Sequence, residues 1–236
     1  MSILAIDTSS QVSGVAVASE GRLAAEIAMQ ARLTHSETLM PHIEQALRMA
    51  GLAKEELAGI AVSVGPGSFT GLRIGMATAK AMAYALELPL VGVSSLQALA
   101  CHFPVPGVRL VALVDAQKGN AYRESYAWES GELRIVDSVS VVPVKDVLAE
   151  CGRWEGKTLL LGDVAEKLMA KDCELPEHVQ IAPPHLRMPR AANVAMLGLK
   201  KLALGDLANI MDLEPLYIRR SEAEVLWEKR HPEAVP

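Results

Sequence analysis

The sequence predicts an α/β protein built from two similar lobes, because one pattern occurs twice along the chain. A short apolar run rich in β-branched residues ends in an aspartate and a polar turn at residues 3–10, and again at residues 110–117. Each run is followed by two more strand-like segments and then by a helical pattern. The chain therefore contains two copies of a β-β-β-α unit.

In the first unit, the helix after the third strand has start and stop signals. Thr34 and Glu37 have the spacing of a capping box, and Gly51 ends the helical pattern. The expected elements are strands at 13–18 and 23–29, a helix at 36–50, a strand at 59–64, a helix ending near 86 and a strand at 88–93.

The second unit follows a segment that resembles a hinge. Pro104, Pro106 and Gly107 lie together in residues 101–109 and favour a crossover between lobes. The expected elements of this unit are strands at 121–128, 133–141 and 158–161 and helices at 144–150, 164–170 and 189–205. We expect lobes at residues 1–103 and 104–236, with the last helix free to pack back on the first lobe.

Composition limits the classes of protein that the chain can belong to. With 236 residues, of which 50% are apolar, it can bury a substantial core. A net charge of −5 argues against independent binding to nucleic acid, which normally requires a basic surface. Three cysteines without CxxC spacing fit a reduced, cytoplasmic location, and neither a targeting segment nor a membrane-spanning run is evident.

The two aspartates that end the paired strands, Asp7 and Asp115, are the first candidate site. Two lobes that face each other would each present an aspartate and a turn of backbone N–H groups, which is the geometry for gripping a phosphate chain and its Mg²⁺. The alternative is turn chemistry, since an aspartate after a strand often caps its own backbone. The repetition favours a duplicated fold and says less about a working site.

A glycine-rich segment at residues 65–75, GPGSFTGLRIG, follows a strand and opens a helix. It does not match a P-loop, because Leu72 and Arg73 stand where Lys and Ser or Thr are required. It does not match a dinucleotide fingerprint either, since its third glycine comes one place late and its strand is the fourth of the lobe.

The helix that this segment opens is apolar nearly all round. Gly71, Gly75 and Ala79 recur every four residues, which permits close approach of a second helix. Two interpretations stay open: a buried pair of helices within the chain, or a protein–protein interface. The candidate interface residues are Leu39, Ile43, Leu47, Gly71, Ile74, Gly75, Ala79 and Met82.

Signals for metal binding and nucleophilic catalysis are weak. The six histidines contain no i, i+4 pair, and the chain has no HExxH or GxSxG motif. We therefore assign no metal ligand and no catalytic residue.

Four segments together resemble the TsaB (YeaZ) family: residues 5–9, 65–75, 114–116 and 215–220. The resemblance covers nearly the whole chain, and residues 65–75 are its most specific part. It implies an actin-like, Hsp70-like two-lobed ATPase fold of the ribonuclease H-like class. It also implies a role in threonylcarbamoylation of the adenosine next to the anticodon, position 37, of tRNAs that read codons beginning with A.

The resemblance also implies partners. The catalytic subunit of that system is the paralogue TsaD, whose metal is held by an HxxxH motif, and a TsaB-like chain binds it through its first two helices. A small ATPase, TsaE, joins them. Because this chain lacks the histidine pair, we expect a non-catalytic subunit. We expect it to form a heterodimer with a TsaD-like protein and to contact tRNA only through the complex. A homodimer is possible when the chain is alone.

Cofactor binding is expected to be weak at most. The fold receives adenosine on a Gly-Gly turn, and only Gly162 followed by Asp163 stands at that place here. The candidate nucleotide contacts are Asp7, Thr8, Ser9, Asp115 and Gly119, for ATP or ADP with magnesium. The alternative function is an independent ATP-dependent phosphotransferase or hydrolase that uses Asp7 and Asp115 around Mg²⁺.

Overall fold

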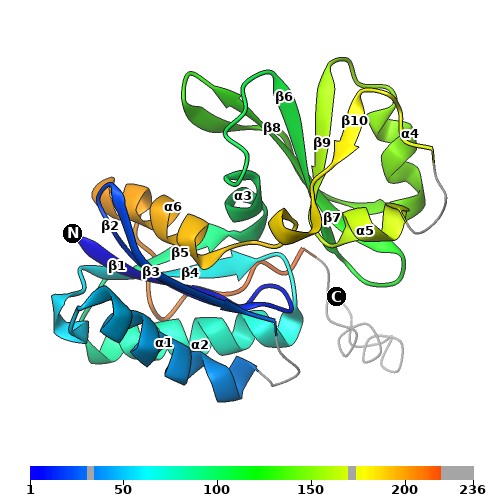
Figure 1. Cartoon of the computed structure of the whole chain (residues 1–236). Helices are drawn as coiled ribbons and strands as arrows, with labels where there is room; N and C mark the ends of the chain where they lie inside the picture. The colour runs from blue at the N-terminus through cyan, green and yellow to red at the C-terminus, as the bar shows by residue number, and fades with distance from the viewer. Residues whose placement is uncertain (31–34, 170–173, 219–236) are drawn as a thin grey trace, which may run out of the picture.

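The computed structural model describes residues 1–30, 35–169 and 174–218, and it contains two five-stranded sheets (Figure 1). The first sheet has the order β3-β2-β1-β4-β5, and the second, read from its β8 edge, has the order β8-β7-β6-β9-β10. Within each sheet the first three strands are antiparallel, and the fourth and fifth run parallel to the first. The strand bounds are Ser2–Asp7 (β1), Ser13–Ser19 (β2), Arg22–Met29 (β3), Gly59–Gly65 (β4), Leu90–Ser94 (β5), Val108–Asp115 (β6), Asn120–Glu129 (β7), Glu132–Pro143 (β8), Lys157–Leu161 (β9) and Val179–Ile181 (β10).

The two sheets share one connectivity, so the predicted two-lobed actin-like fold with duplicated β-β-β-α units is confirmed. Each lobe also repeats the order of its helices, with one after the third strand, one after the fourth and one after the fifth. The α-helices are His35–Ala50 (α1), Phe69–Ala85 (α2), Ser95–Ala100 (α3), Val147–Cys151 (α4), Val164–Met169 (α5) and Ala191–Ala203 (α6), with 3-10 turns at Lys54–Glu56, Val144–Asp146 and Pro184–Leu186.

The third helix of each lobe packs on the sheet of the other lobe. The short helix α3 places Leu96 and Leu99 against Leu110 and Tyr126 of the second sheet. Helix α6 covers one face of the first sheet, where its residues Ala191, Val194, Ala195 and Leu199 contact β1, β2, β4 and β5. The lobes therefore exchange helices, and the first lobe is completed by residues near the end of the chain.

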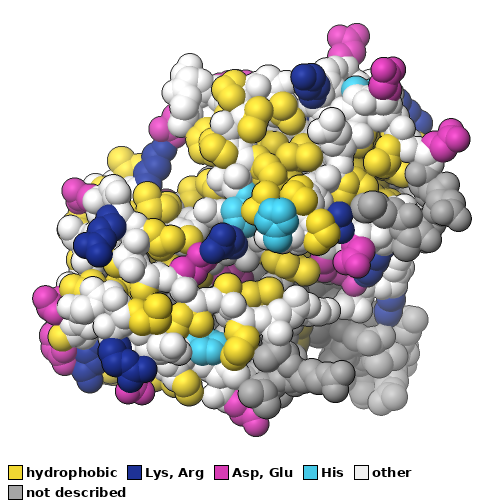
Figure 2. Space-filling model, viewed as in Figure 1, with side chains coloured by type: hydrophobic (Ala, Val, Ile, Leu, Met, Phe, Trp, Pro, Cys, Tyr) yellow, Lys and Arg dark blue, Asp and Glu magenta, His cyan; other side chains and the backbone are white. Residues whose placement is uncertain are grey.

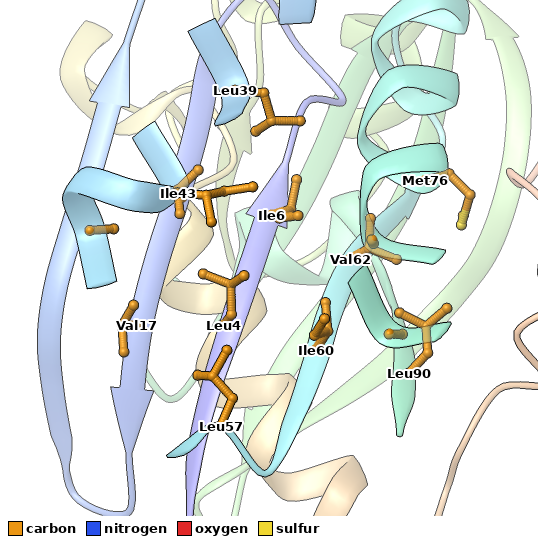
Figure 3. Packing of buried hydrophobic residues seen from close by; sticks show 14 residues of the cluster. Leu4, Ile6, Val17, Leu39, Ile43, Leu57, Ile60, Val62, Met76 and Leu90 are labelled. Carbon is orange, nitrogen blue, oxygen red and sulfur yellow. The ribbon is translucent and has the colours of Figure 1, made fainter. Parts of the chain in front are cut away.

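Helices α1 and α2 cover the opposite face of the first sheet. In Figure 3, Leu39 and Ile43 of α1 point toward the strands that carry Leu4 and Ile6, and Met76 of α2 belongs to the same buried cluster. Alternation along these parallel and antiparallel strands exposes one set of side chains to α1 and α2 and the other set to α6. The first sheet is thus buried on both faces.

Burial changes how the candidate interface residues are interpreted. Five of them are buried in the core of the lobe and therefore cannot contact a partner directly: Leu39, Ile43, Gly71, Gly75 and Ala79. The sequence could not separate the two sides of α2, because glycine and alanine occur on both. Leu47, Ile74 and Met82 are partly exposed, so an interface role for these three stays a prediction.

The expected element bounds differ from the observed ones by a few residues. The last helix was expected at 189–205 and spans Ala191–Ala203, and the third strand of the second lobe continues to Pro143. The capping residue Thr34 lies outside the described residues. Among the described helices, none is long and apolar enough to cross a membrane.

Candidate functional site

The first-lobe turn begins where β1 ends, at Asp7. The Oδ1 atom of Asp7 accepts hydrogen bonds from the backbone N–H of Ser9 at 2.9 Å and from its hydroxyl at 2.7 Å. Asp7, Thr8 and Ser9 are each no more than 2% exposed. This is the turn chemistry typical of an aspartate that follows a strand.

Helix α2 begins directly on top of this turn. The Thr8 hydroxyl donates to the carbonyl oxygen of Gly71 at 2.7 Å, and the backbone N–H of Ser68 donates to the carbonyl oxygen of Ser9 at 2.7 Å. A Cβ atom on Gly71 would lie 2.0 Å from the Thr8 carbonyl oxygen, and one on Gly67 would lie 2.1 Å from that of Ser9. The glycines are therefore required for close backbone approach.

Part of the same glycine segment is used by contacts within the chain. The Ser68 side chain caps α2 by accepting a hydrogen bond from the Gly71 N–H at 3.2 Å. A Cβ on Gly75 would lie 2.2 Å from the hydroxyl oxygen of Thr8. Two N–H groups at the start of this helix, those of Gly71 and Leu72, are thus already bonded to Ser68.

The second-lobe turn has the same first hydrogen bond, because Oδ1 of Asp115 accepts from the backbone N–H of Gln117 at 3.0 Å. Its other oxygen, Oδ2, lies 2.6 Å from the ammonium of Lys167 on α5. Gln117, Lys118 and Gly119 then follow with φ angles of 64°, 54° and 77°. The turn is tied back to the lobe by Val144, whose N–H donates to the Gly119 carbonyl oxygen at 2.9 Å.

Gly162 and Asp163 lie beside this turn, at the end of β9. Gly162 has a φ of 100°, and a Cβ there would lie 1.8 Å from the carbonyl oxygen of Leu113. Asp163 accepts a hydrogen bond from the backbone N–H of Asp115 at 3.2 Å. Burial, together with the nearby negative charge of Asp115, raises the pKa of Asp163 above its ordinary value.

These contacts decide how well the second turn could hold Mg²⁺. Magnesium needs carboxylate oxygens that are free to coordinate it. One oxygen of Asp115 is hydrogen-bonded to the backbone, and the other is neutralised by Lys167. The residues present at this turn therefore fit a magnesium-bound nucleotide poorly.

Sequence reasoning missed Lys167, although a signal for it exists. Asp163 and Lys167 are four residues apart at the start of a helix. Residues at this spacing lie on the same side of a helix, so the lysine is placed near the acidic group. The structure brings Asp115, Asp163 and Lys167 together. Among the described residues, no group of three or more His, Cys, Asp or Glu side chains is placed to hold a metal ion.

Large apolar side chains are exposed on both α1 and α2. Met40 and Met49 of α1 are 53% and 59% exposed, and Tyr84 of α2 is 67% exposed. Leu47, Ile74 and Met82 are partly buried and pack against the core of the first lobe. Charged side chains are scattered on the face of the molecule drawn in Figure 2, without a continuous basic stripe.

Comparisons with known proteins agree with one another over nearly the whole chain. A family model described as TsaD, tRNA N6-adenosine threonylcarbamoyltransferase, matches residues 26–227. The tRNA threonylcarbamoyladenosine biosynthesis protein TsaB of Bacillus subtilis is 34% identical to this chain, and the match covers 96% of this chain and 98% of that protein. The protein of the same name in Escherichia coli is 27% identical, and the match covers 97% of this chain and 98% of that protein. The solved structure of YeaZ from Pseudomonas aeruginosa is similar with a TM-score of 0.76 and 27% identity, covering 92% of this chain and 99% of that one.

Proposed function

The chain belongs to the TsaB (YeaZ) family, and on this premise we propose that it is a non-catalytic subunit in the synthesis of threonylcarbamoyladenosine in tRNA. In this proposal it binds and activates a TsaD-like catalytic subunit. The complex then modifies the adenosine at position 37, next to the anticodon, in tRNAs that read codons beginning with A. A TsaE-like ATPase joins the pair, and tRNA is held by the complex.

The observation that carries the non-catalytic role is the ion pair between Lys167 and Asp115. An aspartate at this turn would have to present an oxygen to Mg²⁺ for phosphoryl chemistry. Here the ammonium already supplies the positive charge. The alternative function, an independent ATP-dependent phosphotransferase or hydrolase, would require Lys167 to move away from Asp115.

ATP turnover separates these two functions. We expect the purified chain, assayed with Mg²⁺ and ATP, to release phosphate no faster than buffer does. Turnover at a rate typical of enzymes, lost in Asp115→Asn, would favour the phosphotransferase or hydrolase. Weak binding of ATP or ADP without turnover is compatible with the proposed subunit.

The solvent-facing side of α1 and α2 is the surface that we propose for the TsaD-like partner. Its exposed side chains include Met40 of α1 and Tyr84 of α2, and these two helices contact each other. Large apolar and aromatic side chains of this kind dominate binding energy at protein interfaces. The same side offers a contact for a homodimer when the chain is alone.

Co-elution with the TsaD-like subunit tests this surface. We expect Met40→Glu and Tyr84→Glu to weaken co-elution strongly while the melting temperature stays near that of the unchanged chain, because both side chains are largely solvent-exposed. The matched control is Ile135→Glu, since Ile135 of β8 is 58% exposed on the other lobe. Unchanged co-elution of both α1 and α2 variants would contradict the assignment.

Reconstitution tests the role in tRNA modification. We expect no threonylcarbamoyladenosine in tRNA from this chain alone, and its formation when TsaD-like and TsaE-like subunits are added with the threonylcarbamoyl donor. Modification by the chain without partners would contradict a non-catalytic role. With a net charge of −5, the chain alone is expected to bind tRNA weakly at physiological salt.

A further inference from the structure

The face of the second sheet that packs on α3 is covered over only part of its width. Leu96 and Leu99 of α3 form one buried cluster with Leu110 and Tyr126, and α3 contacts β6 and β7. Within residues 1–30, 35–169 and 174–218, the edge strand β8 has extensive contacts only with β7. The part of this face that β8 forms therefore has no helix packed over it.

The equivalent face of the first sheet has a complete cover. The 13 residues of α6 contact all five of its strands, including the edge strand β3, which holds the place that β8 has in the second sheet. Helix α3 is the counterpart of α6 and has only six residues. At 1.5 Å per residue, α6 is about 20 Å long and α3 is about 9 Å long. Compared with the first sheet, the second lacks about two helical turns of cover.

Large apolar side chains occupy the uncovered part. Trp128 is paired with Leu133, and Tyr126, which faces α3, is paired with Ile135. Paired residues point to the same face of a sheet, so Leu133 and Ile135 lie on the face that α3 covers in part. Beyond two register shifts the pairing resumes on this face. We call the following residues of β7 and β8 the β8 strip: Tyr122, Trp128, Leu133, Ile135, Val139 and Val141.

The β8 strip continues the interface that α3 makes with the second sheet. Four of its members are partly buried and pack against the cluster that contains Leu96 and Leu99. The other two, Ile135 and Val141, are 58% and 40% exposed. Exposed apolar surface that adjoins a packed interface is typical of a site where another protein binds.

Neighbouring elements border the β8 strip on two sides. Pro106, in the segment after α3, forms a bridge with Trp128. Lys200 of α6 is paired with Glu132, next to Leu133, and Met196 lies four residues before Lys200 and is 46% exposed. Residues four apart share one side of a helix, so Met196 adds apolar surface near this end of the strip.

We propose that the β8 strip is a docking surface for an amphipathic α-helix of a partner protein, which completes the cover that α3 begins. From Leu133 to Val141 the strand extends over about 25 Å, which is enough for about four turns of helix. The partner helix has apolar side chains three and four residues apart toward the strip and polar side chains on its other side. This surface is separate from the one on α1 and α2, which cover the opposite face of the first sheet from α6, so the inference does not depend on the proposed function.

The test uses two synthetic peptides of the same composition, made of leucine, alanine, lysine and glutamate without net charge. One has its leucines three and four residues apart, and the other alternates leucine with polar residues, as a strand does. We expect the first peptide to shift the backbone amide signals of Leu133, Ile135 and Val141 of the isotope-labelled full chain in a saturable manner. Circular dichroism should show that this peptide becomes helical when bound. A stronger response to the alternating peptide would overturn the proposal, because it would indicate strand addition at the β8 edge.

Variants of β8 make the test specific. In Ile135→Glu combined with Val141→Glu we expect the affinity for the helical peptide to fall tenfold or more, with a nearly unchanged melting temperature, since both side chains are exposed. If the double variant is unstable, Ile135→Glu alone replaces it, with an expected fall of threefold or more. Arg134→Glu is the matched control, because Arg134 is exposed and paired with Ala127 on the other face of the hairpin.

Three further outcomes would overturn the proposal. The first is a response to the helical peptide that is confined to residues of α1 and α2. The second is unchanged affinity in the β8 variants. The third is self-association of the chain that these variants abolish, because a second copy would then cover the β8 strip.

Discussion

The two lobes have the same strand order, yet they treat the turn after their first strand in different ways. In the first lobe, Asp7, Thr8 and Ser9 are buried under the start of α2, and the glycines of that helix contact their backbone. In the second lobe, Asp115 lies in a more exposed turn, where it is paired with Lys167. Both aspartates nevertheless accept the same hydrogen bond from the residue two places on.

This difference shows what the shared scaffold determines and what it leaves open. The Asp turn follows from ending a strand at the edge of a sheet, so both lobes retain it. The surroundings are set by the helix that follows the fourth strand: 17 residues long in the first lobe (α2) and six in the second (α5). The long helix forms a buried layer, and the short one supplies a lysine.

The largest expected effect is on the buried side of α2. In Ala79→Glu an unpaired carboxylate would enter a site that is 0% exposed, so we expect a loss of several kcal/mol in the free energy of unfolding, or an insoluble protein. Ala77→Glu is the control, because Ala77 is exposed on the same helix. Denaturant unfolding measures both, and equal stability of the two variants would contradict the burial of this side.

A second test compares a glycine from each lobe. In Gly71→Ala the new Cβ meets a backbone oxygen at 2.0 Å, so we expect a loss of about 3 kcal/mol in the free energy of unfolding. Gly119→Ala meets no atom within 4 Å and changes only a residue with a φ of 77°, for which we expect about 1 kcal/mol. Urea unfolding should rank the two in this order, and a reversed order would show that the second turn is the more constrained.

A third test concerns the helix that the first lobe receives. Glu26 of β3 accepts a hydrogen bond from the N–H of Ala192 at 3.1 Å and is paired with Arg190, so it caps the start of α6. We expect Glu26→Ala to cost about 1 to 2 kcal/mol in thermal unfolding. Glu132→Ala, which removes the exposed partner of Lys200 on the same helix, should have no measurable effect. Similar losses of stability in Glu26→Ala and Glu132→Ala would show that the effect comes from charge pairing in general and not from the helix cap.

The smallest expected effect is a pH dependence confined to the second lobe. Because the pKa of Asp163 is raised on folding, its contribution to stability is present below the ordinary pKa of aspartate and is lost as pH rises through the raised value. The variant Asp163→Asn keeps the side-chain oxygen that accepts the hydrogen bond from the backbone N–H of Asp115. We therefore expect this variant to be slightly more stable than the unchanged chain at pH 7 and equally stable at pH 3. Melting temperatures at the two pH values decide this, and a loss of stability at pH 7 would contradict it.

The sequence was sufficient to predict the duplicated fold, because strand patterns and turn residues are local signals. It did not resolve the role of residues 65–75, since the same glycines serve a phosphate or a close backbone contact. Only the positions of Thr8 and Ser9 against Gly71 and Gly67 distinguish the two. It also missed Lys167 as the partner of Asp115, because that contact joins residues 52 positions apart.

The exchange of α3 and α6 between lobes has a consequence for how the chain folds during synthesis. One face of the first sheet carries Ile3, Ala5 and Val91, and it stays uncovered until residues 191–203 have left the ribosome. At about 5 to 20 residues per second, the roughly 100 residues in between leave that apolar face exposed for several seconds. We therefore expect the nascent chain to need protection of this face during that interval, and a fragment that ends at residue 103 to aggregate rather than fold.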